Sequence, residues 1–490
     1  MKIRSVKYNF VMNVILTMSS IIFPLITFPY VSRVLLVEGN GKIAFASSVI
    51  TYFAMFASLG IPTYGIRICA QVRDDKEKLS QTVQELLIIN IITTAVVTAV
   101  FLYSLWVVPK FQEEKTLLLI NGITLWLNVI GVDWLYSALE QYTYITVRSL
   151  IFKIISIALM FAFVKQKSDY ITYGAINVLA ASGSNILNFI NLRKFVTFHR
   201  CRKYDFKQHM KPIFIFFATS FATSIYTNLD TVMLGFICGD AATGYYNAAT
   251  KIKTVLISIV TSLGTVLLPR LSYYVQRGEK EEFKRIIIKA FDFVLIVASS
   301  FMIYFIIFAK DSVLLLSGEA FLGAVLPMQL LMPTILFIGL TNIMGIQMLV
   351  PMGQEKKVLI SIIWGAAVNV FLNIFLIPRW QASGAAFSAA VTEFVVLLVQ
   401  LYFLHPLLKE IVKIISIRQI IVSSALGSLL LLALNRVLTF RPLFNLIISA
   451  IVFFGCYFIF LIVQKEPFTL EILLPAIKKL KKFHGKKSDS

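Results

Sequence analysis

Long runs of hydrophobic residues follow one another along the whole chain, with short polar segments between them. A helix needs about 20 mainly apolar residues to cross the hydrocarbon core of a membrane, and most of these runs are that long. The pattern therefore predicts an all-α polytopic membrane protein with about 14 transmembrane helices. The expected helices cover residues 10–36, 43–66, 83–108, 116–138, 145–165, 171–192, 213–237, 242–268, 287–309, 322–351, 358–378, 382–404, 419–436 and 443–463.

The second half of the chain repeats features of the first half at a nearly constant spacing of 203 to 213 residues. The matching positions are Gly41 with Gly244, Gly60 with Gly264, Gln141 with Gln354, and Gly174 with Gly384. An even number of helices in each copy makes the copies parallel and relates them by an axis along the membrane normal. We therefore expect two pseudo-symmetric six-helix lobes around a central cleft, followed by two C-terminal helices. This architecture is typical of transporters.

The repeat also defines the expected domains. The N-lobe covers residues 1–192 and the C-lobe covers residues 213–404, with a basic cytoplasmic linker at 193–212 between them. The two C-terminal helices lie within 405–463, and residues 464–490 form a basic cytoplasmic tail.

The composition agrees with a membrane protein. Of all residues, 58% are hydrophobic and only 14% are charged, whereas soluble domains carry roughly 25% charged residues. The net charge of +21 does not indicate a nucleic-acid partner, because the lysines and arginines gather in alternate loops and in the two ends of the chain. The positive-inside rule then places both termini in the cytoplasm and brings the basic segments close to anionic membrane lipids.

Few residues offer catalytic chemistry. The four cysteines are scattered without metal-ligand spacing and no Gly-rich ATP-binding loop is present, so we expect no cofactor. The short outer loops leave no room for a catalytic domain, and the four histidines all lie in segments expected on the cytoplasmic side. These features argue against a membrane glycosyltransferase or polymerase, and we expect a protein that is not an enzyme.

A polar stripe runs along the expected helix 242–268. Its members recur every three or four residues and so share one helix face; they include Asn247, Lys251, Thr254 and Ser258. Lys251 lies roughly 13 Å from the outer end, and a cation at such a depth costs about 2.5–3.5 kcal/mol on insertion scales. We interpret Lys251 as a contact for an anionic substrate; a static ion pair or an outward-reaching side chain are the alternatives. Lys253 points to a different face and is a weaker candidate, with a gating role.

Other charged residues lie near the ends of expected helices. Arg33 is placed beside Asp230 by the repeat, and is a candidate for an outer gate or an anion contact; the alternative is an interfacial residue held by Glu38 or lipid headgroups. At its depth Asp230 needs a cationic partner, for which Lys251 and Arg33 are the candidates. Arg67, at the cytoplasmic end of the second helix, is a candidate contact for an incoming phosphate or an ordinary positive-inside anchor.

Glu393 is the most central acidic residue of the expected helices. A carboxyl group at that depth is either protonated or paired. It is a candidate site for H⁺ or Na⁺ coupling, as is Asp230, and a neutral, hydrogen-bonded glutamic acid is the alternative. Asp133 and Asp292, near the cytoplasmic interface, are expected to pair with nearby lysines and arginines.

Four segments carry a resemblance to a known family: "FPYVSRVLLVEGNGKIAFASSVITYFAMFASLGIPTYGIR", "NLDTVMLGFICGDAATGYYNAATKIKTVL", "LPRLSYYVQRGEKEEFKRIIIKAF" and "MGQEKKVLISIIWGAAVNVFLNIFLIP". Over about residues 1–405 the chain resembles the polysaccharide-biosynthesis flippases of the multidrug/oligosaccharidyl-lipid/polysaccharide (MOP) exporter superfamily. It departs from them where the usual small "LG" turn after Arg33 reads "RVLLVEGNG", with Leu36 in place of glycine.

This resemblance implies a function. Such flippases move undecaprenyl-pyrophosphate-linked oligosaccharide repeat units from the cytoplasmic to the outer leaflet of the bacterial cytoplasmic membrane by alternating access. The units serve O-antigen, capsule or related polymers, so the implied partners are the lipid-linked oligosaccharide, membrane lipids, polysaccharide polymerase and other pathway proteins. A lipid II flippase and a drug/cation antiporter of the same superfamily are the alternatives. An antiporter would favour an acidic cleft, which the stripe bearing Lys251 argues against.

Overall fold

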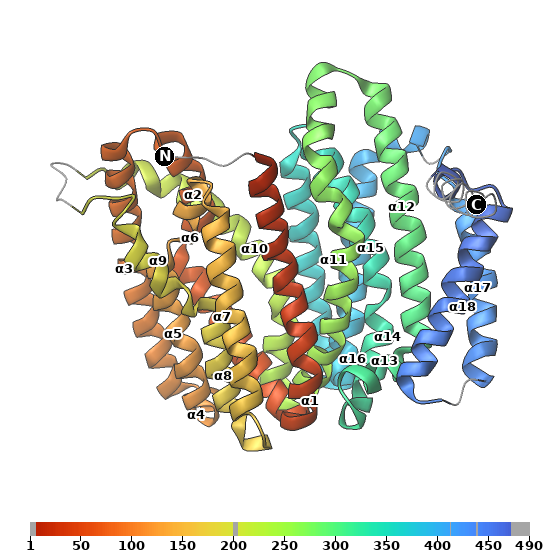
Figure 1. Ribbon diagram of the computed structural model, residues 1–490, viewed down its shortest axis with the longest axis horizontal. Helices are drawn as coiled ribbons and strands as arrows, with labels where there is room; N and C mark the ends of the chain where they lie inside the picture. Colours follow the sequence, from red (N-terminus) through yellow and green to blue (C-terminus); the bar gives the residue numbers. More distant parts are fainter. Residues whose placement is uncertain (1–5, 199–203, 412, 438–439, 472–490) are drawn as a thin grey trace, which may run out of the picture. The chain divides into compact units, whose positions relative to one another are not determined.

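The computed structural model describes residues 6–198, 204–411, 413–437 and 440–471. These residues are folded into helices joined by short loops, and no strand occurs among them. The chain separates into two compact units, Met1–Asn247 and Ala248–Ser490, which are described separately below. Figure 1 gives the labels of the helices.

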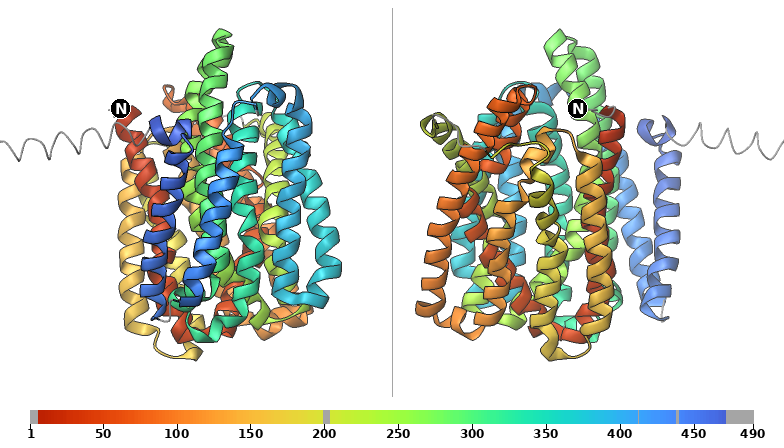
Figure 2. Two further views of the ribbon diagram at one scale, coloured as in Figure 1. Left: turned by 90° about the vertical axis from the view of Figure 1, so that its right-hand side faces the viewer. Right: turned by 60° about the vertical axis from the view of Figure 1, so that its left-hand side comes forward.

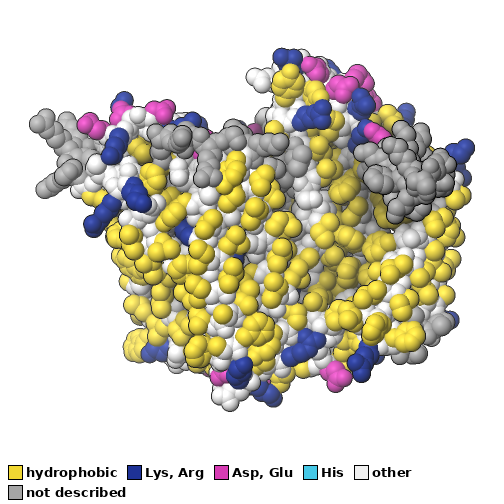
Figure 3. All heavy atoms as spheres, viewed as in Figure 1, with side chains coloured by type: hydrophobic (Ala, Val, Ile, Leu, Met, Phe, Trp, Pro, Cys, Tyr) yellow, Lys and Arg dark blue, Asp and Glu magenta, His cyan; other side chains and the backbone are white. Residues whose placement is uncertain are grey.

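Nine helices within the described residues are long and apolar enough to cross a membrane, and the number rises to 11 if each of two bent helix pairs counts as one span. Two of the longest hold two expected helices each, because α1 (Val6–Ser58) breaks at Leu36 and α16 (Glu355–Ile411) breaks at Gln381. On the face drawn in Figure 3, hydrophobic side chains cover the middle of the helices and charged side chains gather near their ends. The predicted all-α membrane fold is confirmed, although the count of 14 is not fixed by these criteria.

The first unit is built around two hydrophobic clusters. One joins α1, α3, α5, α7 and α8 through residues such as Phe45, Leu117 and Met160, and the other joins α2, α3, α6 and the start of α10 through Ile61, Leu86 and Tyr136. The remaining helices of this unit are α2 (Ile61–Val72), α3 (Lys76–Val107), α4 (Pro109–Glu113), α5 (Lys115–Gly131), α6 (Asp133–Ala138), α7 (Tyr142–Phe163), η1 (Lys167–Asp169), α8 (Tyr170–Val178), the π-helix η2 (Leu179–Gly183), α9 (Asn185–Leu192), α10 (Lys207–Ile237) and the first residues of α11 (Asp240–Arg277).

Hydrogen bonds fix α1 and α7 side by side in one register (Figures 1 and 2). The Thr146 hydroxyl donates to the Met12 carbonyl at 2.9 Å, and the Tyr30 hydroxyl donates to the Val164 carbonyl at 2.8 Å. Both pairs are separated by 134 residues, so the two helices run in the same direction, as expected of the first and fifth spans.

The linker expected at 193–212 is tied to the N-lobe at both of its described ends; residues 199–203 lie outside the described part. On one side, the Thr197 N–H donates to the Ser80 hydroxyl at 3.1 Å. On the other, the Asp205 N–H donates to Glu85 at 2.8 Å, and Glu85 also contacts the buried His209 ring at 2.8 Å. Together with the packing of α10 against α1 and α2, these bonds account for the place of α10 in the first compact unit, although the repeat assigns it to the C-lobe.

The second unit continues α11 and ends in two helices that pack on α12 (Figure 2). Tyr304, Phe308, Phe453 and Tyr457 form its aromatic core, and the Tyr304 hydroxyl donates to the Leu446 carbonyl at 2.7 Å. Its elements are α12 (Lys280–Ile307), α13 (Ala309–Leu316), η3 (Glu319–Ala324), α14 (Val325–Leu331), α15 (Pro333–Asn342), the π-helix η4 (Ile343–Leu349), α16, α17 (Ile417–Val437) and α18 (Pro442–Val463). Of the expected tail, residues 472–490 lie outside the described part.

Candidate functional site

The polar stripe predicted on α11 is present on one regular helix. Lys251 and Thr254 are exposed, and Ser258 is half-buried. The Thr254 hydroxyl donates to the Thr250 carbonyl and the Ser258 hydroxyl donates to the Thr254 carbonyl, both at 2.8 Å. Because each hydroxyl donates to its own helix, its oxygen remains available to accept a hydrogen bond.

Lys251 supplies the positive charge of this stripe. Among the residues that the structure describes, no ion pair or hydrogen bond of Lys251 is found, so its three N–H groups are available to a ligand. Asn247 is half-buried one turn before it, and Lys253 is half-buried on another side of the helix. Lys251, Thr254 and Ser258 therefore share one face of α11, exposed at Lys251 and Thr254 and half-buried at Ser258, and Lys253 lies on another face.

Asp230 is buried on α10 and has an unforeseen partner. The Tyr246 hydroxyl of α11 donates to its carboxylate at 2.5 Å. Arg33 is exposed on α1, and its guanidinium donates to the Pro29 carbonyl at 2.6 Å. Tyr246 and Asp230 lie at similar distances from the turn at Gly239, and this hairpin spacing is the signal that would have paired them.

Two glycines related by the repeat meet where α1 and α11 cross. A Cβ atom added to Gly41 would overlap the backbone carbonyl of Asp240, and one added to Gly244 would overlap the backbone carbonyl of Val37. Val37 and Asp240 are separated by the same 203 residues as the two glycines. The contact is therefore reciprocal, as expected of two equivalent segments of a repeat.

Ion pairs hold the same end of the first unit, which the sequence predicts to be extracytoplasmic. Lys110 of α4 lies 3.0 Å from Asp240 and 2.9 Å from Glu113. Partial burial alone would lower the pKa of Lys110, but the hydrogen bonds to these two carboxylates raise it above the ordinary value. Nearby, Lys42 lies 2.5 Å from the buried Glu114.

At the other end of this unit, the predicted pairing of Asp133 is confirmed. The buried Arg148 of α7 forms an ion pair with Asp133, and it also donates to the Ser184 hydroxyl at 2.6 Å and to Asn185 at 3.2 Å. Asn188 donates to the same carboxylate at 2.8 Å. The buried guanidinium is therefore neutralised and largely satisfied by the protein.

The corresponding prediction for Asp292 is wrong within the described residues. Its carboxylate accepts the Ser416 N–H at 3.1 Å, and no ion pair of Asp292 is found there. The group nonetheless lines a cavity of about 370 Å³ together with Lys284 and Lys289, at the ends of α12 and α16.

The two other candidates lie apart from the stripe along the chain. Glu393 is buried in the second half of α16, in the second unit. Arg67 is exposed on α2, and it forms no ion pair with any described residue. Within the described residues, no group of three or more His, Cys, Asp or Glu side chains is arranged to hold a metal ion.

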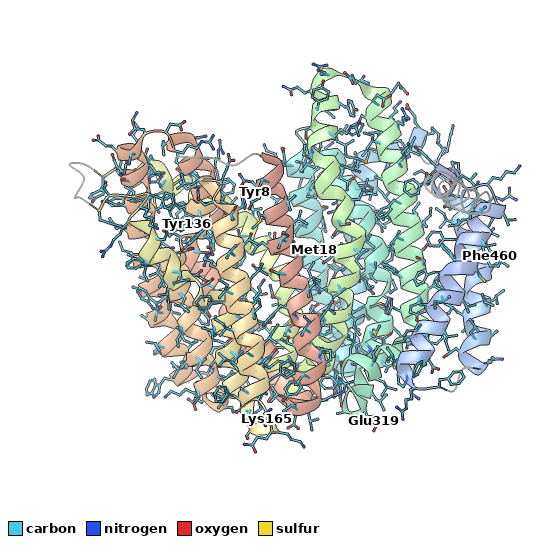
Figure 4. All side chains as sticks on the ribbon, in the orientation of Figure 1. Tyr8, Met18, Tyr136, Lys165, Glu319 and Phe460 are labelled. Atoms are coloured by element: carbon cyan, nitrogen blue, oxygen red, sulfur yellow. The ribbon has the colours of Figure 1, made fainter. Side chains whose placement is uncertain are left out.

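Sequence reasoning missed Lys153 of α7. Its ammonium group donates to the hydroxyls of Ser19 and Ser20 on α1, at 2.8 and 2.9 Å. Figure 4 labels Tyr8 at one end of the first unit and Lys165 at the other, and Lys153 lies between these ends, in the middle of α7. The available signal was a single lysine at the centre of an apolar run.

Comparisons with known proteins agree with this architecture. Residues 6–275 match the sequence model of a family described as "Polysaccharide biosynthesis protein". A protein of Escherichia coli (strain K12) named "Putative O-antigen transporter" is 24% identical over 406 residues, which cover 82% of this chain and 97% of that protein.

Solved structures show a similar fold. The chain resembles the lipid II flippase MurJ in an inward closed conformation with a TM-score of 0.74 at 15% identity, covering 93% of this chain and 99% of that one. An outward-facing multidrug resistance transporter of the MATE family, from the MOP superfamily, matches with a TM-score of 0.54 at 14% identity, over 82% of this chain and 96% of that one. At these identities, the structural matches establish the fold alone.

Proposed function

The chain belongs to the polysaccharide biosynthesis protein family of the MOP exporter superfamily, and we propose that it is a flippase for undecaprenyl-pyrophosphate-linked oligosaccharide repeat units. The repeat unit passes from the cytoplasmic to the outer leaflet of the bacterial cytoplasmic membrane, where a polysaccharide polymerase consumes it for O-antigen, capsule or a related polymer. Both termini lie in the cytoplasm, in agreement with the positive-inside distribution of lysine and arginine.

The observation that carries this proposal is the exposed, unpaired ammonium group of Lys251 in a line of hydroxyl groups on a membrane helix. A pyrophosphate with sugars attached is a charged and strongly hydrated group, and hydrocarbon offers it no hydrogen bonds. A positive charge among hydroxyl groups replaces part of the lost hydration with charge-assisted hydrogen bonds. The stripe of α11 therefore matches the head of a lipid-linked oligosaccharide better than it matches an organic cation.

The candidate residues have separate roles in this scheme. Lys251 binds the pyrophosphate, and Asn247, Thr254 and Ser258 bond to phosphate or sugar oxygens along the same face. Arg67 meets the phosphate at the cytoplasmic end. The polyprenyl chain stays in the lipid, since an apolar tail has no need of the polar path.

Conformational exchange completes the cycle by alternating access between inward- and outward-facing states. Arg33 contributes a gate or anion contact near the outer end, and Lys253 contributes to gating. Binding of H⁺ or Na⁺ at Glu393 or Asp230 is the form of energy coupling that acidic residues within membrane helices can provide.

Transport in proteoliposomes tests the proposal. Purified wild-type protein is reconstituted with a fluorescent lipid-linked oligosaccharide, and movement between leaflets is followed by accessibility of the label to a quencher. Lys251→Ala should slow translocation by about tenfold or more, because a charge-assisted hydrogen bond is worth about 1.5–3 kcal/mol, and Lys251→Glu should abolish it. Lys280→Ala, which removes an exposed lysine at the start of α12, is the matched control. Undiminished transport by Lys251→Glu would contradict the proposed role of the stripe.

The fold match favours one second candidate, a lipid II flippase, because lipid II also carries a pyrophosphate head on a polyprenyl tail. Competition separates the two. If unlabelled lipid II blocks transport of the oligosaccharide at lower concentration than the unlabelled oligosaccharide does, lipid II is the better substrate.

A further inference from the structure

Lys153 lies midway along α7 in the first unit and is half-buried. It is the twelfth of the 22 residues of α7, roughly 15 Å from either end at about 1.5 Å per residue. Its ammonium group donates to the Ser19 and Ser20 hydroxyls of α1, which carry no charge. Among the residues that the structure describes, no carboxylate lies within ion-pair distance of its ammonium group.

Arg148 on the same helix shows what a purely structural cation looks like here. Five residues before Lys153, its guanidinium is buried, paired with Asp133 and bonded to polar side chains near α9. The protein neutralises that charge and leaves the charge of Lys153 uncompensated.

A purely structural role, in which Lys153 only joins α1 to α7, does not account for its positive charge. The Thr146–Met12 and Tyr30–Val164 hydrogen bonds already fix the register of the two helices on both sides of Lys153. A neutral side chain of similar length would join the helices without placing an ammonium group at mid-depth, where charge is disfavoured.

The neighbouring face of α1 is polar and exposed. Asn13, Thr17 and Ser20 follow one another at steps of four and three residues, so they lie in one line on the helix, and all three are exposed. The Thr17 hydroxyl donates to the Asn13 carbonyl at 3.0 Å and the Ser20 hydroxyl donates to the Leu16 carbonyl at 3.2 Å. The Thr17 oxygen therefore remains able to accept a hydrogen bond, and the Ser20 oxygen, which already accepts one from Lys153, keeps a second lone pair. Lys153 sits at one end of this line and adds its only positive charge.

We propose that Lys153, with Ser20, Thr17 and Asn13, forms a second binding station for the pyrophosphate of a lipid-linked sugar, separate from the stripe of α11. This inference rests on the proposed function and adds a residue and a specificity to it. The ammonium group binds the phosphate, exchanging a serine hydroxyl for a charged acceptor, and the line on α1 contacts the first sugar. The ligand is a phosphate ester carried on a polyprenyl tail, rather than a free anion or an ordinary phospholipid.

Binding to the full-length protein in nanodiscs provides the test. The probes are farnesyl pyrophosphate, farnesol, inorganic pyrophosphate and dispersed phosphatidylglycerol, each titrated against wild type, Lys153→Met and Lys153→Arg. Lys165→Met is the matched control, because Lys165 is an exposed lysine just beyond the end of α7. Lys153→Met should weaken farnesyl pyrophosphate binding by about tenfold or more, while farnesol binding stays unchanged. Lys153→Arg should retain most of the affinity, and so should Lys165→Met.

The outcomes separate this inference from its rivals. The inference would be overturned, in favour of a purely structural role for Lys153, if Lys153→Met left the affinity for farnesyl pyrophosphate unchanged. An equal loss of affinity for farnesol would overturn it in the same way. If phosphatidylglycerol or inorganic pyrophosphate competes as well as farnesyl pyrophosphate, the claimed specificity is wrong. Thermal midpoints of the variants show whether the fold is intact, and Lys153→Arg keeps the test valid if Lys153→Met fails to fold. If wild type translocates lipid-linked oligosaccharide and Lys153→Met does so equally well at all substrate concentrations, this inference fails and the proposed function stands. If wild type does not translocate it, the proposed function fails.

Discussion

The two repeats share their backbone geometry where α1 and α11 cross, but they differ in the side chains they place along the same helices. Gly41 and Gly244 make reciprocal backbone contacts at a spacing of 203 residues. About two turns further along each helix, the same spacing places Ser48 in the N-lobe and Lys251 in the C-lobe. The shared positions are those that the fold requires, whereas the unshared positions are free to carry function.

Lys153 of the N-lobe also occupies a position that the two repeats do not share. At the spacing that relates Gln141 to Gln354, its counterpart in the C-lobe is Ala366. Lys251 and Lys153 thus come from different repeats, each at a position where the other repeat has no lysine, and neither has a carboxylate partner among the described residues. Under the proposed function, these two lysines would hold the anionic head at two successive places.

The largest expected effect concerns the shared glycines. Gly41→Ala or Gly244→Ala places a methyl group on a backbone carbonyl, which cannot move away as a flexible side chain would. Each should destabilise the protein by about 3 kcal/mol or more, measured by thermal or denaturant unfolding in detergent. Gly455→Ala is the control, because a Cβ there meets open space and alanine improves helix propensity by about 1 kcal/mol. Equal stability of the three variants would mean that the crossing is looser than described.

The second prediction concerns Lys251, the cation that the N-lobe lacks at the equivalent position. Lys251→Ser gives the C-lobe the residue that the N-lobe has at Ser48. Transport of the lipid-linked oligosaccharide should fall by about tenfold or more, while the thermal midpoint stays the same or rises, because an uncompensated charge is lost from a membrane helix. A variant that loses stability and transport in parallel would show that Lys251 is structural.

The third prediction concerns Asp240, whose counterpart is the apolar Val37. Asp240→Val should remove the ion pair with Lys110 and cost about 1 kcal/mol, since Lys110 keeps Glu113 as a partner. The pair raises the pKa of Lys110, so its contribution is complete below the ordinary lysine value of 10.5 and is lost as the pH rises through the raised value. Unfolding of wild type and Asp240→Val at neutral and at strongly alkaline pH measures the difference, which should disappear at the alkaline end.

The sequence predicts the helices, the alignment of the two repeats and the shared face of α11, because all three depend on periodic patterns. The apolar runs indicate the helices, the repeat spacing aligns Gly41 with Gly244, and the 3.6-residue period places Lys251, Thr254 and Ser258 on one face. Contacts between helices could not be predicted in this way, since they depend on how each helix is rotated about its axis. The partners of Lys153 lie more than 130 residues away on α1, and α7 carries no polar stripe that would indicate them. The contacts of Arg148 with Ser184 and Asn185 were missed for the same reason, whereas the hairpin spacing about Gly239 would have paired Tyr246 with Asp230.

Leu36 shows a further limit of sequence reasoning. Leu36 stands where the resembling family has a glycine, yet the turn between the two halves of α1 is present, with Leu36 at a φ of 57°. Its counterpart at the same repeat spacing is Gly239, at a φ of 83°. The N-lobe thus adopts the same left-handed turn with a residue that disfavours it.

The smallest expected effect follows from this pair of turns. Gly239→Ala should cost about 1 kcal/mol, because a Cβ there meets open space and only the positive φ opposes the substitution. Leu36→Gly should gain at most about 1 kcal/mol, because relief of the backbone strain is offset by lost side-chain packing and by the greater freedom of glycine in the unfolded chain. Unfolding midpoints of the two single variants and of their combination measure both effects. A Leu36→Gly variant less stable than Gly239→Ala would mean that the leucine side chain, rather than the backbone, holds this turn in shape, and that the two repeats reach the same geometry for different reasons.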